Sequence, residues 1–161
     1  YYQVLEVWYP YLRLREEKIP VVFLGTTKEQ YSSKEGYPVK ADRVIKKVKA
    51  TDFSGVIIPG GFAPDILRRY QEINKFVSDL YKQGKLVASI CHGGWVLVSS
   101  GILKGKRATS FYAIKDDLIN AGAKFLDKEV VVDRNLITSR NPYDLSLFCK
   151  EIIKFLKRSG T

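Results

Sequence analysis

The sequence predicts an α/β fold with a mainly parallel sheet, and two observations support this prediction. Short apolar runs alternate along the chain with longer amphipathic stretches, as in consecutive βαβ units. The most compact apolar runs lie at residues 21–24, 55–59 and 86–90, and each has glycine or proline within three residues of its ends, as is typical of strands buried on both faces. A chain of 161 residues is long enough to form one domain with a well-buried core.

The remaining elements follow from periodicity and turn residues. Apolar residues at helical spacing predict helices at 5–17, 63–83, 114–121 and 144–157, and a further helix that begins after residue 93 and ends at Gly101. Shorter strands are expected at 107–110, 130–133 and 136–139. Residues 26–40 contain several turn formers, so a hairpin or an irregular excursion is expected there.

The start of the sequence predicts a missing element. The chain contains no methionine, and its first predicted element is a helix. Because a doubly wound sheet normally opens with a strand, we expect about ten upstream residues to form a first strand. The expected domain therefore covers residues 1–161 together with that strand.

Composition narrows the class of protein. The net charge is +10, but the lysines and arginines are spread along the chain without a clustered run or an RNA-binding signature. This distribution favours a solvated basic surface over a specific nucleic-acid interface. No apolar stretch approaches the length of a membrane helix, so no membrane partner is expected. Two cysteines without a disulfide framework favour a reducing, cytoplasmic location.

Cys91 is the main candidate for a reactive residue. It follows the predicted strand 86–90 and precedes Gly93 and Gly94, a pattern typical of a sharp turn that lifts a nucleophile out of a sheet. The N-terminus of the following helix is expected to lower the thiol pKa. Cys149 lies on the apolar side of the last predicted helix and is expected to be a core residue.

Two other features adjoin Cys91 in the predicted fold. His92 is the single histidine, and at this turn it can act as a general acid or base. Gly60 and Gly61 follow the predicted strand 55–59, and their amides, with that of His92, are candidate oxyanion donors. One histidine beside one reactive cysteine does not supply a zinc site, and no Gly-rich phosphate loop is present. The sequence therefore predicts neither a metal nor a cofactor.

Five segments together carry a specific combination of motifs. They are Ile-Pro-Gly-Gly-Phe-Ala-Pro-Asp at 58–65, Ala-Ser-Ile-Cys-His-Gly at 88–93, Ile-Lys-Asp-Asp-Leu-Ile-Asn-Ala-Gly at 114–122, Val-Val-Val-Asp at 130–133 and Thr-Ser-Arg at 138–140. In this combination the chain resembles the ThiJ/PfpI family, and within it the PfpI-type intracellular cysteine peptidases. The resemblance implies a flavodoxin-like three-layer sandwich with Cys91 at a nucleophile elbow and His92 beside it.

The resemblance also implies two carboxylates. The segment around Glu6 is similar to the family segment whose glutamate hydrogen-bonds the cysteine, and a protonated carboxyl there would stabilise a thiolate. Asp65 matches the acidic residue that reaches the histidine of a neighbouring subunit in the peptidase branch. The site would then be completed only in a homo-oligomer, either a dimer or a hexamer.

The chain departs from the family pattern at three positions. After His-Gly the family often has proline, whereas this chain has Gly94-Trp95, and the bulky Trp95 is expected to narrow the pocket or fill the core. Phe111 stands where the peptidases commonly have tyrosine, which removes a hydroxyl from the substrate pocket. Asp65 replaces the more common glutamate and has a shorter reach.

Three functions are compatible with these residues. The first is a cysteine hydrolase of peptides or small amides, with Cys91 as nucleophile, His92 moving protons and Asp65 orienting His92. The second is a glyoxalase- or deglycase-like enzyme in which Cys91 adds to a dicarbonyl or a glycated adduct and Glu6 or His92 moves the proton. The third is a non-enzymatic redox-sensing or chaperone-like stress protein in which Cys91 oxidises. The hydrolase is expected first because both His92 and Asp65 are present.

Overall fold

The computed structural model describes residues 1–27 and 29–160. The helices are α1 (Val4–Glu16), α2 (Ala63–Leu67), α3 (Gln71–Lys82), α4 (Gly94–Ser99), α5 (Lys115–Asn120) and α6 (Leu145–Arg158). The strands are β1 (Leu24–Gly25), β2 (Gln30–Ser32), β3 (Pro38–Lys40), β4 (Arg43–Val44), β5 (Gly55–Ile58), β6 (Leu86–Ile90), β7 (Arg107–Ala108), β8 (Lys124–Phe125), β9 (Val130–Asp133) and β10 (Leu136–Ser139).

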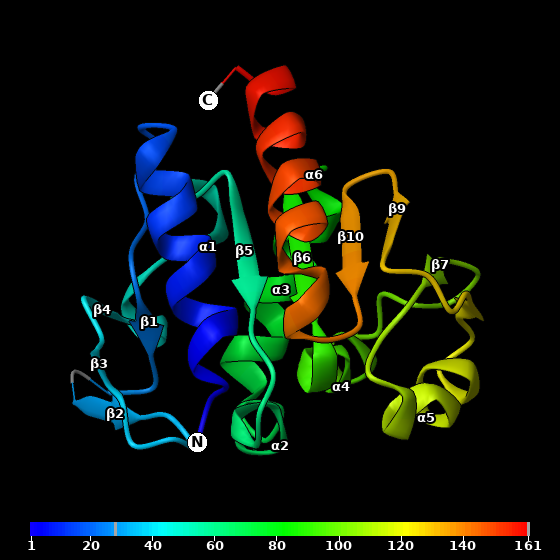
Figure 1. The fold of residues 1–161 in the computed structure, drawn as a ribbon, viewed down its shortest axis with the longest axis horizontal. Coiled ribbons are helices and arrows are strands. Elements are labelled where there is room, and N and C mark those ends of the chain that lie inside the picture. Colours follow the sequence, from blue (N-terminus) through cyan, green and yellow to red (C-terminus); the bar gives the residue numbers. More distant parts are fainter. Residues whose placement is uncertain (28, 161) are drawn as a thin grey trace.

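A four-stranded sheet in the order β5-β6-β10-β9 forms the centre of the molecule (Figure 1). β6 runs parallel to both neighbours, with Val87 opposite Val56 on one side and Leu136 on the other. β9 joins the edge antiparallel to β10. In Figure 1, β5 and β10 both point to the lower end of the molecule, so the carboxyl ends of the parallel strands meet there.

Helices cover both faces of this sheet. Along β6, Leu86, Ala88 and Ile90 belong to the same apolar cluster as Phe148 of α6 and Leu14 of α1. Val87 faces the other way and belongs to a second cluster with residues of α3 and α4. All five residues of β6 are buried because the strand has neighbours on both edges and helices on both faces. The predicted flavodoxin-like three-layer sandwich is confirmed, with α1 and α6 in front of the sheet and α3 and α4 behind it in Figure 1.

Smaller ladders lie beside the central sheet. β2 and β3 form an antiparallel hairpin within the predicted excursion at 26–40, of which residue 28 lies outside the described residues. β1 pairs with β4, and β7 pairs with β8, each pair in parallel. The expected upstream strand concerns residues outside this sequence and stays a prediction. Within the described ranges, no helix combines the length and apolar character needed to cross a bilayer.

Three predicted elements differ from the structure. The helix predicted at 63–83 is two helices, because α2 ends at Leu67 and the backbone at Tyr70 is extended, with ψ 112°. The Asn74 side chain supports this break by donating a 2.8 Å hydrogen bond to the carbonyl of Arg68. Arg68, Arg69 and Tyr70 each also bond back to a carbonyl of the preceding turn.

The two remaining differences are short strands. The strand predicted at 107–110 ends at Ala108, because the next amide, that of Thr109, donates to the Thr138 hydroxyl at 2.9 Å. The strand predicted at 21–24 is reduced to Leu24–Gly25, because the backbone of Phe23 is held in a loop by Asp42. The Phe23 amide donates to the Asp42 carboxylate, and the Phe23 carbonyl accepts from the Asp42 amide. In both cases a polar side chain distant in sequence replaces a regular ladder bond.

Candidate active site

Cys91 lies at a sharp turn where β6 ends and a short 3-10 segment, Cys91–Gly93, leads into α4. Its φ of 59° is in the left-handed region, which residues with a side chain adopt only when their surroundings enforce it. Gly93 allows the turn to pack closely, since a Cβ there would lie 2.6 Å from the carbonyl oxygen of Ile58. The sequence Cys-His-Gly-Gly therefore folds into an elbow that directs the thiol toward the carboxyl ends of the strands.

Glu6 is the acidic group beside this elbow. It lies in the first turn of α1, where the Gln3 side chain accepts hydrogen bonds from the amides of Leu5 and Glu6. Only 1% of Glu6 is exposed, and its Oε2 accepts a 2.6 Å hydrogen bond from the Gly60 amide. Among the described residues, the other oxygen, Oε1, has no hydrogen-bond partner. One carboxyl oxygen is thus held by the backbone and the other is available to a proton or a ligand.

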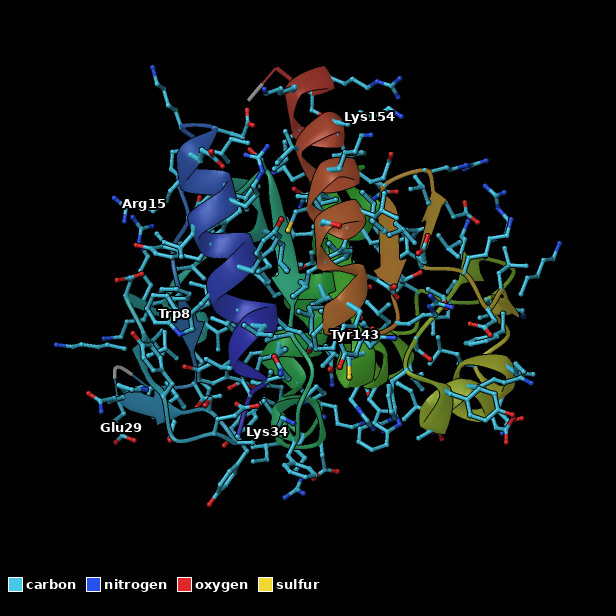
Figure 2. The ribbon with its side chains drawn as sticks, in the orientation of Figure 1. Trp8, Arg15, Glu29, Lys34, Tyr143 and Lys154 are labelled. Carbon is cyan, nitrogen blue, oxygen red and sulfur yellow. The ribbon has the colours of Figure 1, made fainter. Side chains whose placement is uncertain are left out.

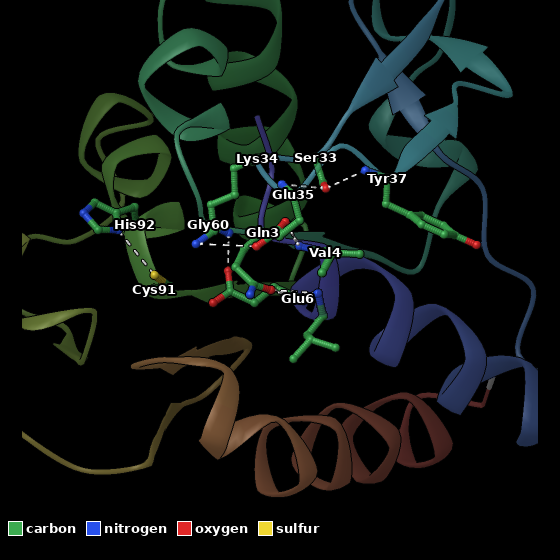
Figure 3. Close-up of polar contacts among 11 residues, drawn as sticks. Gln3, Val4, Glu6, Ser33, Lys34, Glu35, Tyr37, Gly60, Cys91 and His92 are labelled. Carbon is green, nitrogen blue, oxygen red and sulfur yellow. Dashed lines mark hydrogen bonds and ion pairs between the residues drawn. The ribbon is translucent and has the colours of Figure 1, made fainter.

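Gly60 brings Cys91 and Glu6 together (Figure 3). A Cβ at this position would lie 2.7 Å from both the Cys91 Cβ and the Glu6 Oε2, so no larger residue fits without moving the site. Because the Gly60 amide is engaged by Glu6, it is not an oxyanion donor as the sequence suggested. The amides of Gly61 and His92 interact with the Cys91 sulfur and lower its pKa, so they are the donors that face a developing negative charge.

The protonation of the pair differs from the sequence prediction. Burial raises the pKa of Glu6 to about 7, against the lowering effect of the Gly60 amide. Burial, and next the nearby Glu6 carboxylate, raise the pKa of Cys91 to about 12. The predicted low thiol pKa is therefore wrong, because burial and the Glu6 carboxylate outweigh the lowering effect of the His92 and Gly61 amides. At neutral pH the thiol therefore keeps its proton, and a thiolate forms only when a nearby base such as the Glu6 carboxylate accepts that proton during the reaction.

His92 contacts both the thiol and two aromatic rings. Its Nδ1 lies 3.3 Å from the Cys91 sulfur, as Figure 3 shows. Its ring stacks on Phe111, with centroids 5.0 Å apart, and meets Trp95 edge-on at 5.2 Å. Burial, and next the charge of Lys34, lower the pKa of His92 below its ordinary value. Trp95 and Phe111 thus orient a neutral imidazole beside the sulfur.

Asp65 is not brought to His92 within the chain. It lies in the first turn of α2 and forms an ion pair with Arg69, which also bonds to its backbone carbonyl. About half of the Asp65 side chain is exposed. Among the described residues, no hydrogen bond or ion pair joins it to His92. Its contribution from a neighbouring subunit stays a prediction.

Lys34 is a site residue that the sequence did not indicate. It follows β2, and its amide donates to the Tyr2 carbonyl, which fixes this loop against the start of α1. Its charge lowers the pKa of both Glu6 and His92. Figure 2 shows Lys34 at the lower end of the molecule, to which the strands point, and Figure 3 shows it beside Gly60. No sequence signal separates it from the other basic residues, because its position depends on a bridge between Tyr2 and Ser33.

The geometry places a candidate nucleophile beside a candidate acid–base partner in the same chain. Cys91 supplies the sulfur, Glu6 can hold or release a proton near neutral pH, and the Gly61 and His92 amides can stabilise negative charge. Cys149, in contrast, is buried in α6 as predicted, and burial raises its pKa to about 12. Over the described part of the chain, no group of three or more His, Cys, Asp or Glu side chains could hold a metal ion.

The fold and the elbow define a flavodoxin-like sandwich protein with a cysteine at the sharp turn after β6. The sequence profile of the DJ-1/PfpI family matches residues 1–155, and the chain belongs to this family. The resemblance seen in the sequence is therefore confirmed.

Three known proteins illustrate the relationship. The chain is 40% identical over 156 residues to Deglycase PfpI of Pyrococcus furiosus, and the match covers 97% of this chain and 94% of that protein. It is 44% identical over 129 residues to "Putative cysteine protease YraA" of Bacillus subtilis, covering 80% and 76% of the two chains. A solved two-domain protein of Anabaena variabilis, with DJ-1/ThiJ/PfpI-like and ferritin-like domains, superposes with a TM-score of 0.95 and 43% identity. That match covers 97% of this chain but only 47% of the two-domain chain.

Proposed function

We propose that this protein is a deglycase-type enzyme that removes dicarbonyl-derived adducts from amino groups through Cys91. The observation that carries the proposal is the pairing of Cys91 with a buried carboxyl, Glu6, whose pKa of about 7 suits proton transfer at neutral pH. Both groups belong to one chain and need no second subunit. The name of the relative from Pyrococcus furiosus, a deglycase, supports the same chemistry.

The reaction is balanced with water as the only co-reactant. For an aminocarbinol formed from an amine and methylglyoxal, the Cys91 sulfur bonds to the carbinol carbon as the carbon–nitrogen bond breaks. The thiol proton passes to the Glu6 carboxylate and then to the departing amine. The carbinol C–H hydrogen then moves to the adjacent carbonyl carbon, and the proton of the carbinol hydroxyl moves to the carbonyl oxygen. These two transfers convert the bound hemithioacetal into a lactate thioester. Water hydrolyses the thioester, releases lactate and restores the thiol.

The test uses NMR to measure the release of amine and lactate from a methylglyoxal adduct of N-acetyllysine, and it compares the unmodified chain with three variants. Cys91→Ser and Glu6→Gln should each lose activity by about 100-fold or more, because one removes the nucleophile and the other the proton carrier. Asp65→Asn is the matched acidic control and should stay within about twofold. A folded Glu6→Gln variant with full activity would overturn the proposal.

A second readout separates deglycation from removal of free dicarbonyl. The adduct concentration is varied while free methylglyoxal is held constant. Under the proposal, the rate rises with adduct concentration. A rate that follows free methylglyoxal alone would instead assign a glyoxalase activity to Cys91 and Glu6.

A peptidase is the second candidate. It is favoured by the 3.3 Å approach of His92 to the Cys91 sulfur and by the name of the relative from Bacillus subtilis. It requires Asp65 of another subunit to orient His92, since Asp65 pairs with Arg69 in its own chain. Cleavage of a fluorogenic peptide, lost in both Cys91→Ser and Asp65→Ala, would favour this candidate. If peroxide oxidises Cys91 and neither the adduct nor the peptide is turned over, the remaining candidate function is a redox sensor.

A further inference from the structure

A hollow with a volume of about 680 Å³ lies at the end of the sheet opposite Cys91. It is bounded by the ends of α3 and α6, by the turn between β9 and β10 and by the loop before β7, at the upper end of Figure 1. We call it the basic pocket. Its lining residues are Tyr81, Lys82, Gly84, Lys106, Arg134, Asn135, Phe155, Arg158 and Ser159.

All charged residues that line the basic pocket are cations, namely Lys82, Lys106, Arg134 and Arg158. Within residues 1–27 and 29–160, none of the four forms an ion pair, whereas Arg140 elsewhere on the surface lies between Asp127 and Asp144.

The acids nearest in sequence to the basic pocket are already engaged. Asp79 pairs with Lys75 at 2.6 Å, and Asp133 accepts the amide of Arg107 at 2.8 Å. The pocket therefore concentrates positive charge that the chain itself does not neutralise.

A stabilising effect on the helices explains the presence of only two of these four cations. Lys82 and Arg158 lie in the last turns of α3 and α6, where cations are favoured by the helix dipole. Lys106 and Arg134 belong to no helix. Arg134 occupies a turn position with φ 57°, where glycine or asparagine would be less strained, so the turn does not require an arginine. Two of the four cations thus lack a local structural reason.

Aromatic surface accompanies the cations. Tyr81 and Phe155 are half-buried in the pocket lining, and the Lys106 ammonium lies 5.8 Å from the centre of the Tyr81 ring. The Asn135 side chain donates to the carbonyls of Tyr81 and Lys85, at 3.0 and 2.7 Å, and so holds β10 and the end of α3 in place. The pocket volume is in the range of small-ligand sites.

We propose that the basic pocket binds a ligand carrying two or more linked phosphate groups. Four unpaired cations around one hollow match several phosphate charges better than a single one. The two aromatic residues suit a base attached to the phosphates, so the source is either a nucleotide polyphosphate or the backbone of a single nucleic-acid strand. The five residues of β6 separate this pocket from Cys91 by more than about 15 Å, and the proposal does not depend on the proposed function.

The test measures binding of inorganic tripolyphosphate to the full chain by calorimetry, at low and moderate salt. The variant Lys106→Gln/Arg134→Gln should weaken binding by about tenfold or more, because it removes two of the four cations and keeps a polar side chain at each position. The matched control is Lys40→Gln/Arg43→Gln, one exposed lysine and one exposed arginine on β3 and β4. The control should bind within about twofold of the unmodified chain.

Equal loss in both variants would show attraction to net charge alone and would overturn the proposal, as would absence of binding to the unmodified chain. Adenosine triphosphate and a short oligothymidine then separate the two sources of phosphate. Stronger binding of the oligothymidine assigns a strand, and stronger binding of the nucleotide assigns a small ligand. Deglycase turnover should be the same in all variants, so failure here and failure of the proposed function are distinct results.

Discussion

Among single residues, Glu6 and Cys91 share the proton on which the chemistry of the site depends. Burial raises the pKa of both groups, so at neutral pH the thiol keeps its proton while the carboxyl is close to half ionised. The ionised carboxyl is then the base that accepts the thiol proton as sulfur attacks. Glu6 has one oxygen held by Gly60 and one without a partner, which suits this exchange.

The raised pKa of Glu6 predicts a pH-dependent stability. The folded chain holds the Glu6 proton more tightly than the unfolded chain, so this contribution is complete below pH 4.5 and is lost as the pH rises through about 7. A rise from 4.5 to about 7 corresponds to about 3 kcal/mol. Relative to Glu6→Gln, the free energy of unfolding of the unmodified chain should therefore fall by roughly that amount between pH 5 and 8.

The measurement is urea unfolding of both proteins across that pH range. Taking the difference between them removes the contribution of His92, whose lowered pKa acts in the opposite direction in part of the same range. A difference that stays constant with pH would mean that Glu6 is ionised throughout.

Among the elements, the turn after β6 stores backbone strain at the nucleophile. A left-handed backbone is unfavourable for a residue with a Cβ by about 1–2 kcal/mol and is free of this penalty for glycine. Packing around Gly60 and Gly93 leaves no room for the turn to relax. The strain is therefore maintained by the surrounding sheet rather than by the turn itself.

We expect Cys91→Gly to be more stable to urea than Cys91→Ala by about 1 kcal/mol, because both remove the sulfur and only glycine relieves the φ of 59°. The control is Ala113→Gly, an exposed residue that is not among those with positive φ. There the glycine should be the less stable residue. Equal stability of the two Cys91 variants would mean that the elbow carries no strain.

The accuracy of the sequence predictions differs between kinds of element. Buried runs such as residues 86–90 and the amphipathic last helix were predicted within one residue, because their burial pattern is local. The break between α2 and α3 is supported by a side-chain hydrogen bond from Asn74 to Arg68, and the early end of β7 depends on Thr138, which is 29 residues from Thr109. Periodicity carries no information about such contacts.

Across the whole molecule, the sheet brings together residues that are far apart in the chain. The position of Cys91 could be predicted from its own strand and glycines, whereas Glu6 was identified only through the family resemblance. Lys34 and the engagement of the Gly60 amide could not be predicted, because they depend on how α1 and β2 pack on the end of the sheet. The thiol pKa was predicted in the wrong direction, because the sequence does not show how fully Cys91 and Glu6 are buried together.

Mixing two inactive variants tests whether a second subunit completes the site. In the peptidase candidate, each site needs Cys91 of one chain and Asp65 of another. Cys91→Ser and Asp65→Ala chains, each inactive alone, should then recover about a quarter of the unmodified activity when refolded together in equal amounts, for a dimer or a closed ring alike. In the deglycase candidate, Glu6 and Cys91 lie in one chain, so the Asp65→Ala chain should be active alone and mixing should add nothing. Peptide and adduct turnover measured on the same mixtures therefore separate a shared site from a site that each chain holds by itself.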